Sequence, residues 1–78
     1  MHYYRIRELR EDNDLTQQYI ATYLRVAQNT YSNYENGNRE IPISQMIRLA
    51  EYYNVNMDYL LGRTDVSEPL PPTKRMPL

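Results

Sequence analysis

Residues 15–36 constrain the fold more than any other stretch, because they predict two short amphipathic helices joined by a tight turn. Thr16 is a favourable N-cap residue for the first of these helices. The apolar face of that helix follows a spacing of i, i+1 and i+4 and consists of Ile20, Ala21 and Leu24. The pattern breaks at Arg25, and Val26 is expected to point into the core. A helix, a turn and a second helix must therefore fit into 22 residues.

The second helix of this pair has an unusual outer face. It is predicted from Gln28 to Asn36 and ends at Gly37, because glycine readily adopts the left-handed conformation that follows a helix. Tyr31 and Tyr34 share its inner side, whereas the outer side carries Gln28, Asn29, Ser32 and Asn33. Glutamine and asparagine can form two hydrogen bonds with N6 and N7 of adenine in the major groove of DNA. We therefore expect these four residues to contact base edges, with Ser32 equally suited to a phosphate. The alternative is an ordinary polar helix face.

The length and composition of the chain limit it to one small domain. A chain of 78 residues has a thin buried core and marginal stability. The absence of cysteine rules out a disulfide framework and a thiolate metal site. No apolar run approaches ~18 residues, and the N-terminus has no signal-peptide core. We therefore expect a cytoplasmic protein that neither spans a membrane nor is secreted.

The reactive side chains do not predict an enzyme. His2 is the only histidine and lies near the N-terminus, where it is expected to be frayed. Two glycines are too few for a glycine-rich phosphate loop, and the acidic residues are scattered over predicted helix surfaces. The sequence predicts no catalytic residue, no metal ligand set, no cofactor and no small-molecule ligand.

The net charge of −1 argues against nucleic-acid binding, because DNA-binding domains usually carry a basic excess. Residues 1–61 contain six arginines against eight acidic residues. The distribution of charge matters more than its sum, because the local field governs attraction at a surface. Four acids gather near the end of the first predicted helix: Glu8, Glu11, Asp12 and Asp14. Among residues 28–39, Glu35 is the only acidic residue. This pattern permits DNA binding and predicts a modest non-specific affinity.

Five helices and a proline-rich tail account for the whole chain. The helices are predicted at residues 3–13, 17–24, 28–36, 42–53 and 57–61. In the fourth helix, four residues are expected to face the core: Ile43, Met46, Ile47 and Ala50. Asn54 is expected to follow that helix in the left-handed conformation, and Asn56 to cap the fifth. No strand-like alternation appears, so the chain is predicted to be all-α.

Residues 63–78 differ from the domain predicted at residues 1–62. They contain four prolines, which forbid a helix and favour extended polyproline geometry. We expect this tail to be disordered. The alternatives are that Val66, Leu70 and the prolines fold back on the domain, or that they contact a partner or a second copy.

Taken together, these features resemble the Cro/repressor-type helix-turn-helix domain, also called the XRE family. The matching segments are IRELRED, LTQ, IA..L.V, Q.TYSNYENG, REIP, MIRLAEYYNV and DYLLG. The resemblance covers residues 6–62, which is 57 of the 78 residues. It implies a compact five-helix, lambda-repressor-like domain in which residues 28–36 form the helix that enters the major groove.

The resemblance also implies contacts with the DNA backbone. Gln17 matches a glutamine that binds a phosphate at the start of the second helix, and a helix N-terminus favours anions in any case. Thr30 is suited to a phosphate or a thymine methyl group. The loop after the recognition helix is expected to contact phosphates through Asn36, Asn38 and Arg39.

Two further features bear on the stability of the motif. Arg10 and Glu35 match a structural ion pair of the family, in which the planar guanidinium holds the carboxylate with two prongs. Arg25 stands where a glycine is usual, at a position expected to need a positive φ. A non-glycine residue in that conformation costs about 1 kcal/mol. The Arg25 side chain is expected near a DNA phosphate. Ala27 replaces the usual Ser or Thr N-cap, at a further cost of about 1 kcal/mol.

The function implied by the resemblance is sequence-specific binding of double-stranded DNA by a homodimer. Two-fold symmetry would place half-sites about 34 Å apart on a near-palindromic operator. Transcriptional repression is the expected consequence. The alternative is a protein-interaction module, an antitoxin or adaptor, that keeps the fold but binds a protein instead.

Overall fold

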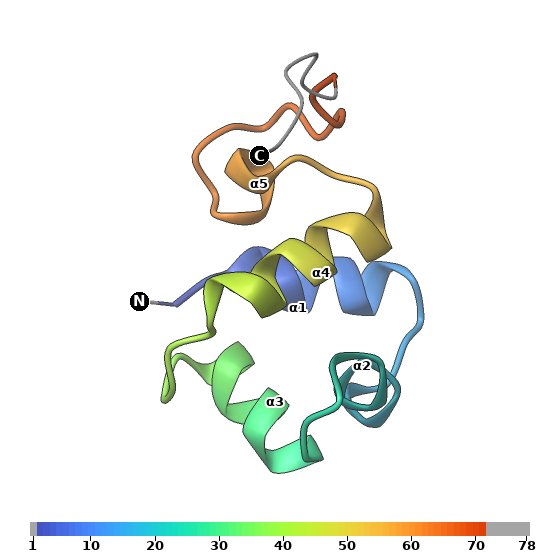
Figure 1. The fold of residues 1–78 in the computed structure, drawn as a ribbon, viewed down its shortest axis with the longest axis vertical. Helices are drawn as coiled ribbons and strands as arrows, with labels where there is room; N and C mark the ends of the chain where they lie inside the picture. The colour runs from blue at the N-terminus through green and yellow to red at the C-terminus, as the bar shows by residue number, and fades with distance from the viewer. Residues whose placement is uncertain (1, 72–78) are drawn as a thin grey trace, which may run out of the picture.

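The computed structural model describes residues 2–71, which form five α-helices and no strand. Their bounds lie within one residue of those predicted: α1 (Tyr4–Asp12), α2 (Gln17–Leu24), α3 (Gln28–Asn36), α4 (Ile43–Tyr53) and α5 (Met57–Leu60). Figure 1 shows α2 and α3 at one end of the molecule and α5 at the other, with α1 and α4 between them. None of the helices between residues 2 and 71 is long and apolar enough to cross a membrane.

The helix ends lie where local signals predicted them. The Thr16 hydroxyl accepts a hydrogen bond of 3.0 Å from the backbone N–H of Tyr19, and the Asn56 side chain accepts one of 2.7 Å from Tyr59. Asn54 follows α4 in the left-handed conformation, with a φ of 56°. Gly37 follows α3 with a φ of 77°, and a Cβ atom there would also lie only 3.2 Å from the Cβ of His2. Both the positive φ and the close approach of His2 therefore favour glycine at this turn.

The core is a single cluster to which all five helices contribute. Its fully buried large apolar side chains are Ile6, Ile20, Leu24, Tyr31, Leu49 and Leu60. Tyr31 packs edge-on against Tyr34, with ring centroids 6.5 Å apart. The two tyrosines of α3 thus occupy the interior, as predicted from their spacing.

The prediction that Ile43 and Ile47 face the core is wrong. These side chains are 67% and 45% exposed, whereas Leu49 is fully buried. The inward face of α4 is formed by Met46, Leu49 and Ala50, a stripe at i, i+3 and i+4. A helical turn spans 3.6 residues, so Ile43 and Ile47 form a neighbouring stripe that is rotated toward solvent. Both stripes are apolar, and the sequence pattern alone did not show which one is buried.

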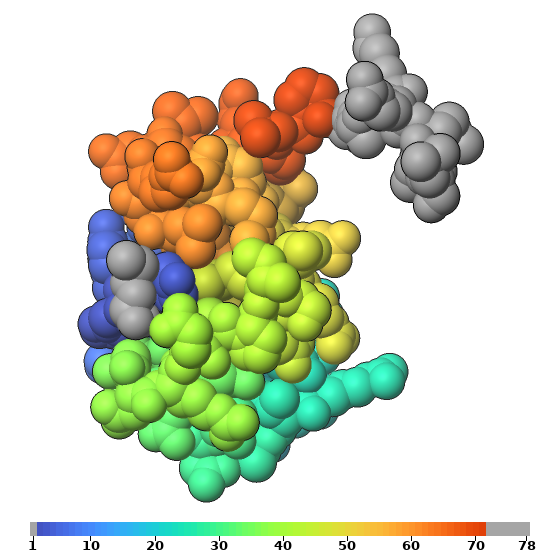
Figure 2. Space-filling view, turned by 60° about the vertical axis from the view of Figure 1, so that its left-hand side comes forward, coloured from blue at the N-terminus to red at the C-terminus, as the bar shows by residue number. Residues whose placement is uncertain are grey.

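Residues 63–70 form a returning segment that folds back over α5. The side-chain amide of Asn56 donates hydrogen bonds of 2.8 Å to the carbonyl oxygens of Val66 and Glu68. The backbone N–H of Asn56 donates a third, of 3.2 Å, to the carbonyl of Ser67. Figure 2 shows this segment, in orange and red, covering the end of the molecule beyond α4. The rest of the predicted tail, residues 72–78, lies outside the described residues.

Candidate nucleic-acid interface

The turn between α2 and α3 spans residues 25–27 and has the geometry expected of it. Arg25 adopts the left-handed conformation, with φ 61° and ψ 43°. The N–H groups of Arg25 and Val26 donate to the carbonyls of Thr22 and Ala21, at 3.1 and 3.0 Å. These bonds satisfy the end of α2 while the Arg25 side chain remains exposed. A non-glycine residue at this φ costs about 1 kcal/mol, so the turn is held against local strain.

Two side chains of α4 support this turn, and sequence analysis did not identify them. Gln45 donates a hydrogen bond of 2.9 Å to the carbonyl of Leu24, and Arg48 donates one of 2.8 Å to the carbonyl of Tyr23. The Arg48 guanidinium also lies over the Tyr23 ring, 5.0 Å from its centroid. The bonded residues are 21 and 25 positions apart. Spacing within one helix could not have revealed these contacts.

A polar hollow lies where α3 begins beside the start of α2. It is lined by Gln17, Gln28, Asn29, Ser32 and Asn33. The hollow thus gathers all four residues predicted to contact bases, together with one predicted phosphate contact. Gln28 and Asn29 are exposed, whereas Ser32 and Asn33 are half-buried. Its lining consists of amides and one hydroxyl, so it offers hydrogen-bond donors and acceptors without a formal charge.

The other predicted phosphate contacts lie outside this hollow. Four are exposed, namely Arg25, Asn36, Asn38 and Arg39, and Thr30 is half-buried. The backbone N–H groups of Asn38 and Arg39 both donate to the carbonyl of Asn33, at 3.0 and 3.2 Å. Asn36 lies one turn beyond Ser32, with its side-chain amide 3.5 Å from the Ser32 hydroxyl. The loop after α3 is therefore fixed to the last turns of the helix that carries the hollow.

A buried ionic network lies behind the hollow. Arg10 on α1 donates hydrogen bonds of 2.6 and 3.1 Å to the two carboxylate oxygens of Glu35 on α3. Its third donor reaches the carbonyl of Leu15, at 2.8 Å. Gln17 donates a further hydrogen bond of 3.0 Å to Glu35. Glu35 therefore connects α1, the start of α2 and α3, and it orients the Gln17 side chain at the edge of the hollow.

The environment of Glu35 keeps it ionised. Burial alone would raise the pKa of this carboxyl group, but the hydrogen bonds from Arg10 and Gln17 and the charge of Arg10 outweigh burial and lower it. The Tyr31 hydroxyl lies beside the same carboxylate and also lowers its pKa, although it misses the geometry of a full hydrogen bond. The negative charge of the one acidic residue of α3 is thus compensated by Arg10 in the interior. With its side chain 1% exposed, Glu35 contributes little repulsion toward a polyanion approaching the hollow.

Two short helices joined by a tight turn, with the second helix presenting polar side chains, define a helix-turn-helix domain. The comparison with protein families agrees: the helix-turn-helix family model matches residues 6–60. The chain belongs to this family, in its XRE branch.

The relatives of the chain are bacterial and phage regulators. It is 35% identical over 69 residues to the uncharacterized HTH-type transcriptional regulator YobD of Bacillus subtilis. The matched region covers 88% of this chain and 62% of YobD. It is 38% identical over 64 residues to the HTH-type transcriptional regulator ImmR of the same organism, covering 82% of this chain and 50% of ImmR. It is 34% identical over 74 residues to the cryptic phage CTXphi transcriptional repressor RstR of Vibrio cholerae. This match covers 92% of this chain and 67% of RstR.

The chain therefore spans about half to two thirds of the length of these relatives. No solved structure gives a significant match.

Proposed function

We propose that this protein is a transcriptional regulator that binds duplex DNA sequence-specifically, with α3 in the major groove. The observation that carries the proposal is the polar hollow, which offers uncharged amides at the N-terminal half of an exposed helix. That half of the recognition helix is the part that meets base edges in helix-turn-helix proteins. Relatives named as transcriptional regulators and as a repressor support a regulator rather than an enzyme.

In this proposal the residues of the hollow and its surroundings have separate tasks. Gln28, Asn29 and Asn33 read base edges, preferring adenine, and Ser32 contacts a base or a phosphate. The start of α2 binds a phosphate through Gln17 and its free backbone N–H groups. The surrounding residues bind further phosphates and fix the position of the protein without reading sequence: Arg25, Thr30, Asn36, Asn38 and Arg39.

The binding species is a homodimer on a near-palindromic operator. A two-fold pair of α3 helices would enter successive major grooves about 34 Å apart, one helical turn of DNA. Repression follows when such a dimer covers a promoter, and the cytoplasm of a bacterial cell is where it would act. The name of the Vibrio relative, a transcriptional repressor, favours repression over activation.

The second candidate is a protein-interaction module, an antitoxin or adaptor. The acidic balance and the exposed apolar side chains of α4 favour it. The two candidates differ in their response to salt. Each phosphate neutralised by an arginine adds about 0.9 to the slope of log affinity against log salt concentration, and binding to a protein lacks this steep dependence.

The test is the salt dependence of duplex binding by four proteins: the natural chain, Arg25→Gln, Arg39→Gln and the control Arg7→Gln. Arg7 is exposed on α1, where it pairs only with Glu11 among the contacts observed. Each substitution removes one phosphate contact from both copies of the dimer. We therefore expect the slope to fall by about 1.8 in each of the first two variants and to stay unchanged in Arg7→Gln. Folded protein that does not bind any duplex at low salt would contradict the proposal and favour the protein-interaction module.

A further inference from the structure

The last turn of α2 is completed by side chains from another helix. An α-helix leaves its last four carbonyl groups without a partner inside the helix, and in α2 these belong to residues 21–24. The first two accept from the backbone N–H groups of Val26 and Arg25, within the turn. The last two accept from side chains of α4, from Arg48 at 2.8 Å and from Gln45 at 2.9 Å. The end of α2 is therefore fully hydrogen-bonded only while α4 lies beside it.

The Tyr23 ring adds further contacts between α2 and α4. Its hydroxyl donates a hydrogen bond of 3.2 Å to the carbonyl of Arg48, whose guanidinium lies over the same ring. Tyr52 lies one turn further along α4, and its ring centroid is 4.9 Å from that of Tyr23. We call Gln45, Arg48 and Tyr52, which together hold the end of α2, the α4 clamp.

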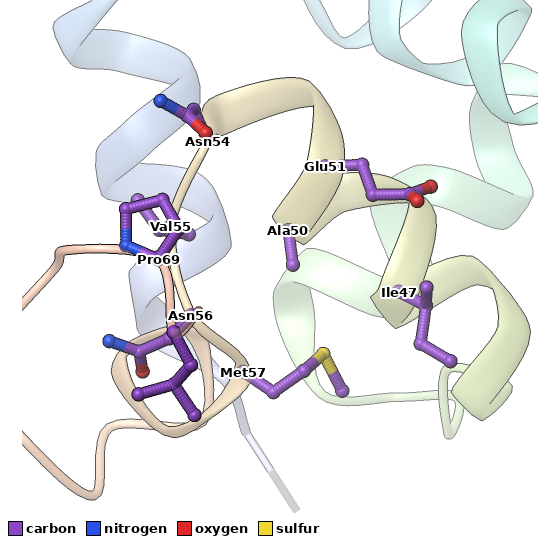
Figure 3. Close-up of a pocket in the computed structure, with 9 residues that line it drawn as sticks. Ile47, Ala50, Glu51, Asn54, Val55, Asn56, Met57 and Pro69 are labelled. Atoms are coloured by element: carbon purple, nitrogen blue, oxygen red, sulfur yellow. The ribbon is translucent and has the colours of Figure 1, made fainter. Parts of the chain in front are cut away.

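The α4 clamp occupies one side of its helix. Another side of α4 lines an apolar groove together with α5 and the returning segment. Figure 3 shows Ile47 and Ala50 on α4 near Met57 of α5 at this groove. No residue of the α4 clamp is among those that line the groove. The clamp can therefore be altered without removing a side chain from the groove.

The first turn of α3 has few attachments of its own. The buried residues of this helix are Tyr31, Tyr34 and Glu35, so residues 28–30 include none. Ala27 supplies no side-chain cap. Arg25 holds a left-handed conformation that a non-glycine residue adopts only at an energetic cost. The chain that leads into α3 thus relies on contacts from elsewhere, and the α4 clamp provides them at the two residues directly before Arg25.

We propose that the α4 clamp positions the first turn of α3 for reading bases, with Gln45 and Arg48 as positioning residues that do not themselves touch DNA. The inference rests on the proposed function, since it concerns the same base contacts. Gln28 and Asn29 lie in that first turn, whereas Asn33 lies one turn later, next to the buried part of the helix. Hydrogen bonds weaken steeply as their angle departs from linearity. A small displacement of the first turn should therefore weaken the contacts of Gln28 and Asn29 and preserve those of Asn33.

Three variants of the full chain test this role. Gln45→Met and Arg48→Met each remove the donor to one carbonyl of α2 and keep an unbranched side chain. Because they act on separate carbonyls, either variant suffices if the other does not fold, and circular dichroism verifies folding. Arg63→Met is the matched control. It removes the same charge from an exposed position in the returning segment.

The first measurement is hydrogen exchange at single backbone N–H groups, without DNA. Val26 donates to the carbonyl of Ala21 in the turn, and Tyr31 donates to the carbonyl of Ala27 across the first turn of α3. In Gln45→Met and Arg48→Met, exchange at these two groups should rise about fivefold relative to the second half of α3, as expected for the loss of one hydrogen bond. Arg63→Met should leave it unchanged. Unchanged exchange, or an equal rise throughout α3, would overturn the inference.

The second measurement is base discrimination on the duplex that the natural protein selects from a randomised library. Gln45→Met and Arg48→Met should reduce discrimination about fivefold or more at the base pairs that Asn29→Ala relaxes. They should preserve it at the base pairs that Asn33→Ala relaxes, and Arg63→Met should preserve both. A purely stabilising role would not separate the two sets of base pairs. Full discrimination by both clamp variants would overturn the inference.

The salt dependence of binding separates positioning from a direct phosphate contact. The slope of log affinity against log salt concentration should be the same in Arg48→Met and in the natural chain. A fall of about 1.8, one phosphate from each copy of a dimer, would instead make Arg48 a phosphate contact and overturn its positioning role.

The failure of this inference can be distinguished from failure of the proposed function. If the folded natural chain selects no duplex, the regulator is refuted, and the inference that rests on it falls too, even where exchange shows that the clamp holds the first turn. If the natural chain selects a duplex that both clamp variants read with full discrimination, only the positioning role is refuted.

Discussion

Replacing Glu35 by glutamine should destabilise this protein far more than a surface substitution would. The change keeps the size and shape of the side chain but removes the charge. It leaves Arg10, whose side chain is only 12% exposed, without its counter-ion. The Glu35 side chain itself is 1% exposed and accepts hydrogen bonds from Arg10 and Gln17. The substitution therefore leaves a buried cation uncompensated.

The magnitude follows from that geometry. Removing one partner of a buried ion pair costs about 3–5 kcal/mol. The upper part of that range applies to fully buried pairs, and Arg10 keeps some access to solvent. We therefore expect Glu35→Gln to lose about 3 kcal/mol. A domain of this size has a total unfolding free energy near the lower end of the usual 5–15 kcal/mol. The variant should thus be close to its unfolding midpoint at moderate temperature.

The assay is urea unfolding followed by circular dichroism at neutral pH, arranged as a double-mutant cycle with Arg10→Met. The double variant should lose clearly less than the sum of the two single losses, because neither buried charge is then left alone. The control is Arg7→Met, which breaks the exposed 3.3 Å pair between Arg7 and Glu11 on α1. A pair of that kind is worth only about 0.3–0.5 kcal/mol. Losses below about 1 kcal/mol in both Glu35→Gln and Arg10→Met would show that neither substitution leaves an uncompensated buried charge.

Three further predictions concern neighbouring features. Because the folded-state pKa of Glu35 is lowered, its contribution to stability is present above the unfolded value of about 4.3 and is lost as pH falls through the folded pKa. A pH series of unfolding free energies should show this loss in the natural chain, and the acid decline should be shallower in Glu35→Gln. Ala27→Ser should raise the unfolding free energy by about 1 kcal/mol, because α3 has no side-chain cap, and thermal unfolding measures this gain. Asn56→Asp keeps the acceptor that caps α5 but loses both donors to the returning segment. It should therefore cost about 1–3 kcal/mol and speed hydrogen exchange at the backbone N–H of Asn56, and unchanged exchange would contradict this role.

Local signals predicted the helices because the residues that form each signal lie within one turn of one another. The Thr16 side chain caps α2 by accepting a hydrogen bond from the backbone N–H three residues later. Arg25 and Asn54 take the left-handed conformation where the helical pattern ends. Ser32 and Asn33 lie one turn after Gln28 and Asn29, so a helix necessarily brings the four predicted base contacts to one face. The polar face of α3 could therefore be predicted without any knowledge of the tertiary fold, whereas the place of Gln17 beside it depends on how α2 packs against α3.

Features that depend on packing between helices could not be predicted in the same way. The hydrogen bonds of Gln45 and Arg48 to the end of α2 join residues more than 20 positions apart. Ile43 and Ile47 belong to an apolar stripe adjacent to the buried one, and only the position of α4 against the core decides which stripe is covered. The burial of Arg5 under the returning segment likewise depends on how that segment folds over α5.

The hydrogen bond between Gln17 and Glu35 was missed for a related reason. The family resemblance predicted that Gln17 contacts a phosphate and that Glu35 forms an ion pair with Arg10, as two separate roles. The structure joins them, because the start of α2 lies beside the buried carboxylate. A change in Glu35 should consequently disturb both the stability of the domain and the orientation of a proposed phosphate contact.

In the proposed function, the amides of the polar hollow read a DNA sequence. Selection from a randomised duplex library examines this role with the natural protein, Asn29→Ala, Asn33→Ala and the control Asn13→Ala. Asn13 is an exposed asparagine after α1, away from the hollow. We expect a near-palindromic motif that Asn29→Ala and Asn33→Ala each relax at different A·T positions, and that Asn13→Ala leaves unchanged. The same motif from all four proteins, or no enrichment by folded protein at low salt, would contradict it.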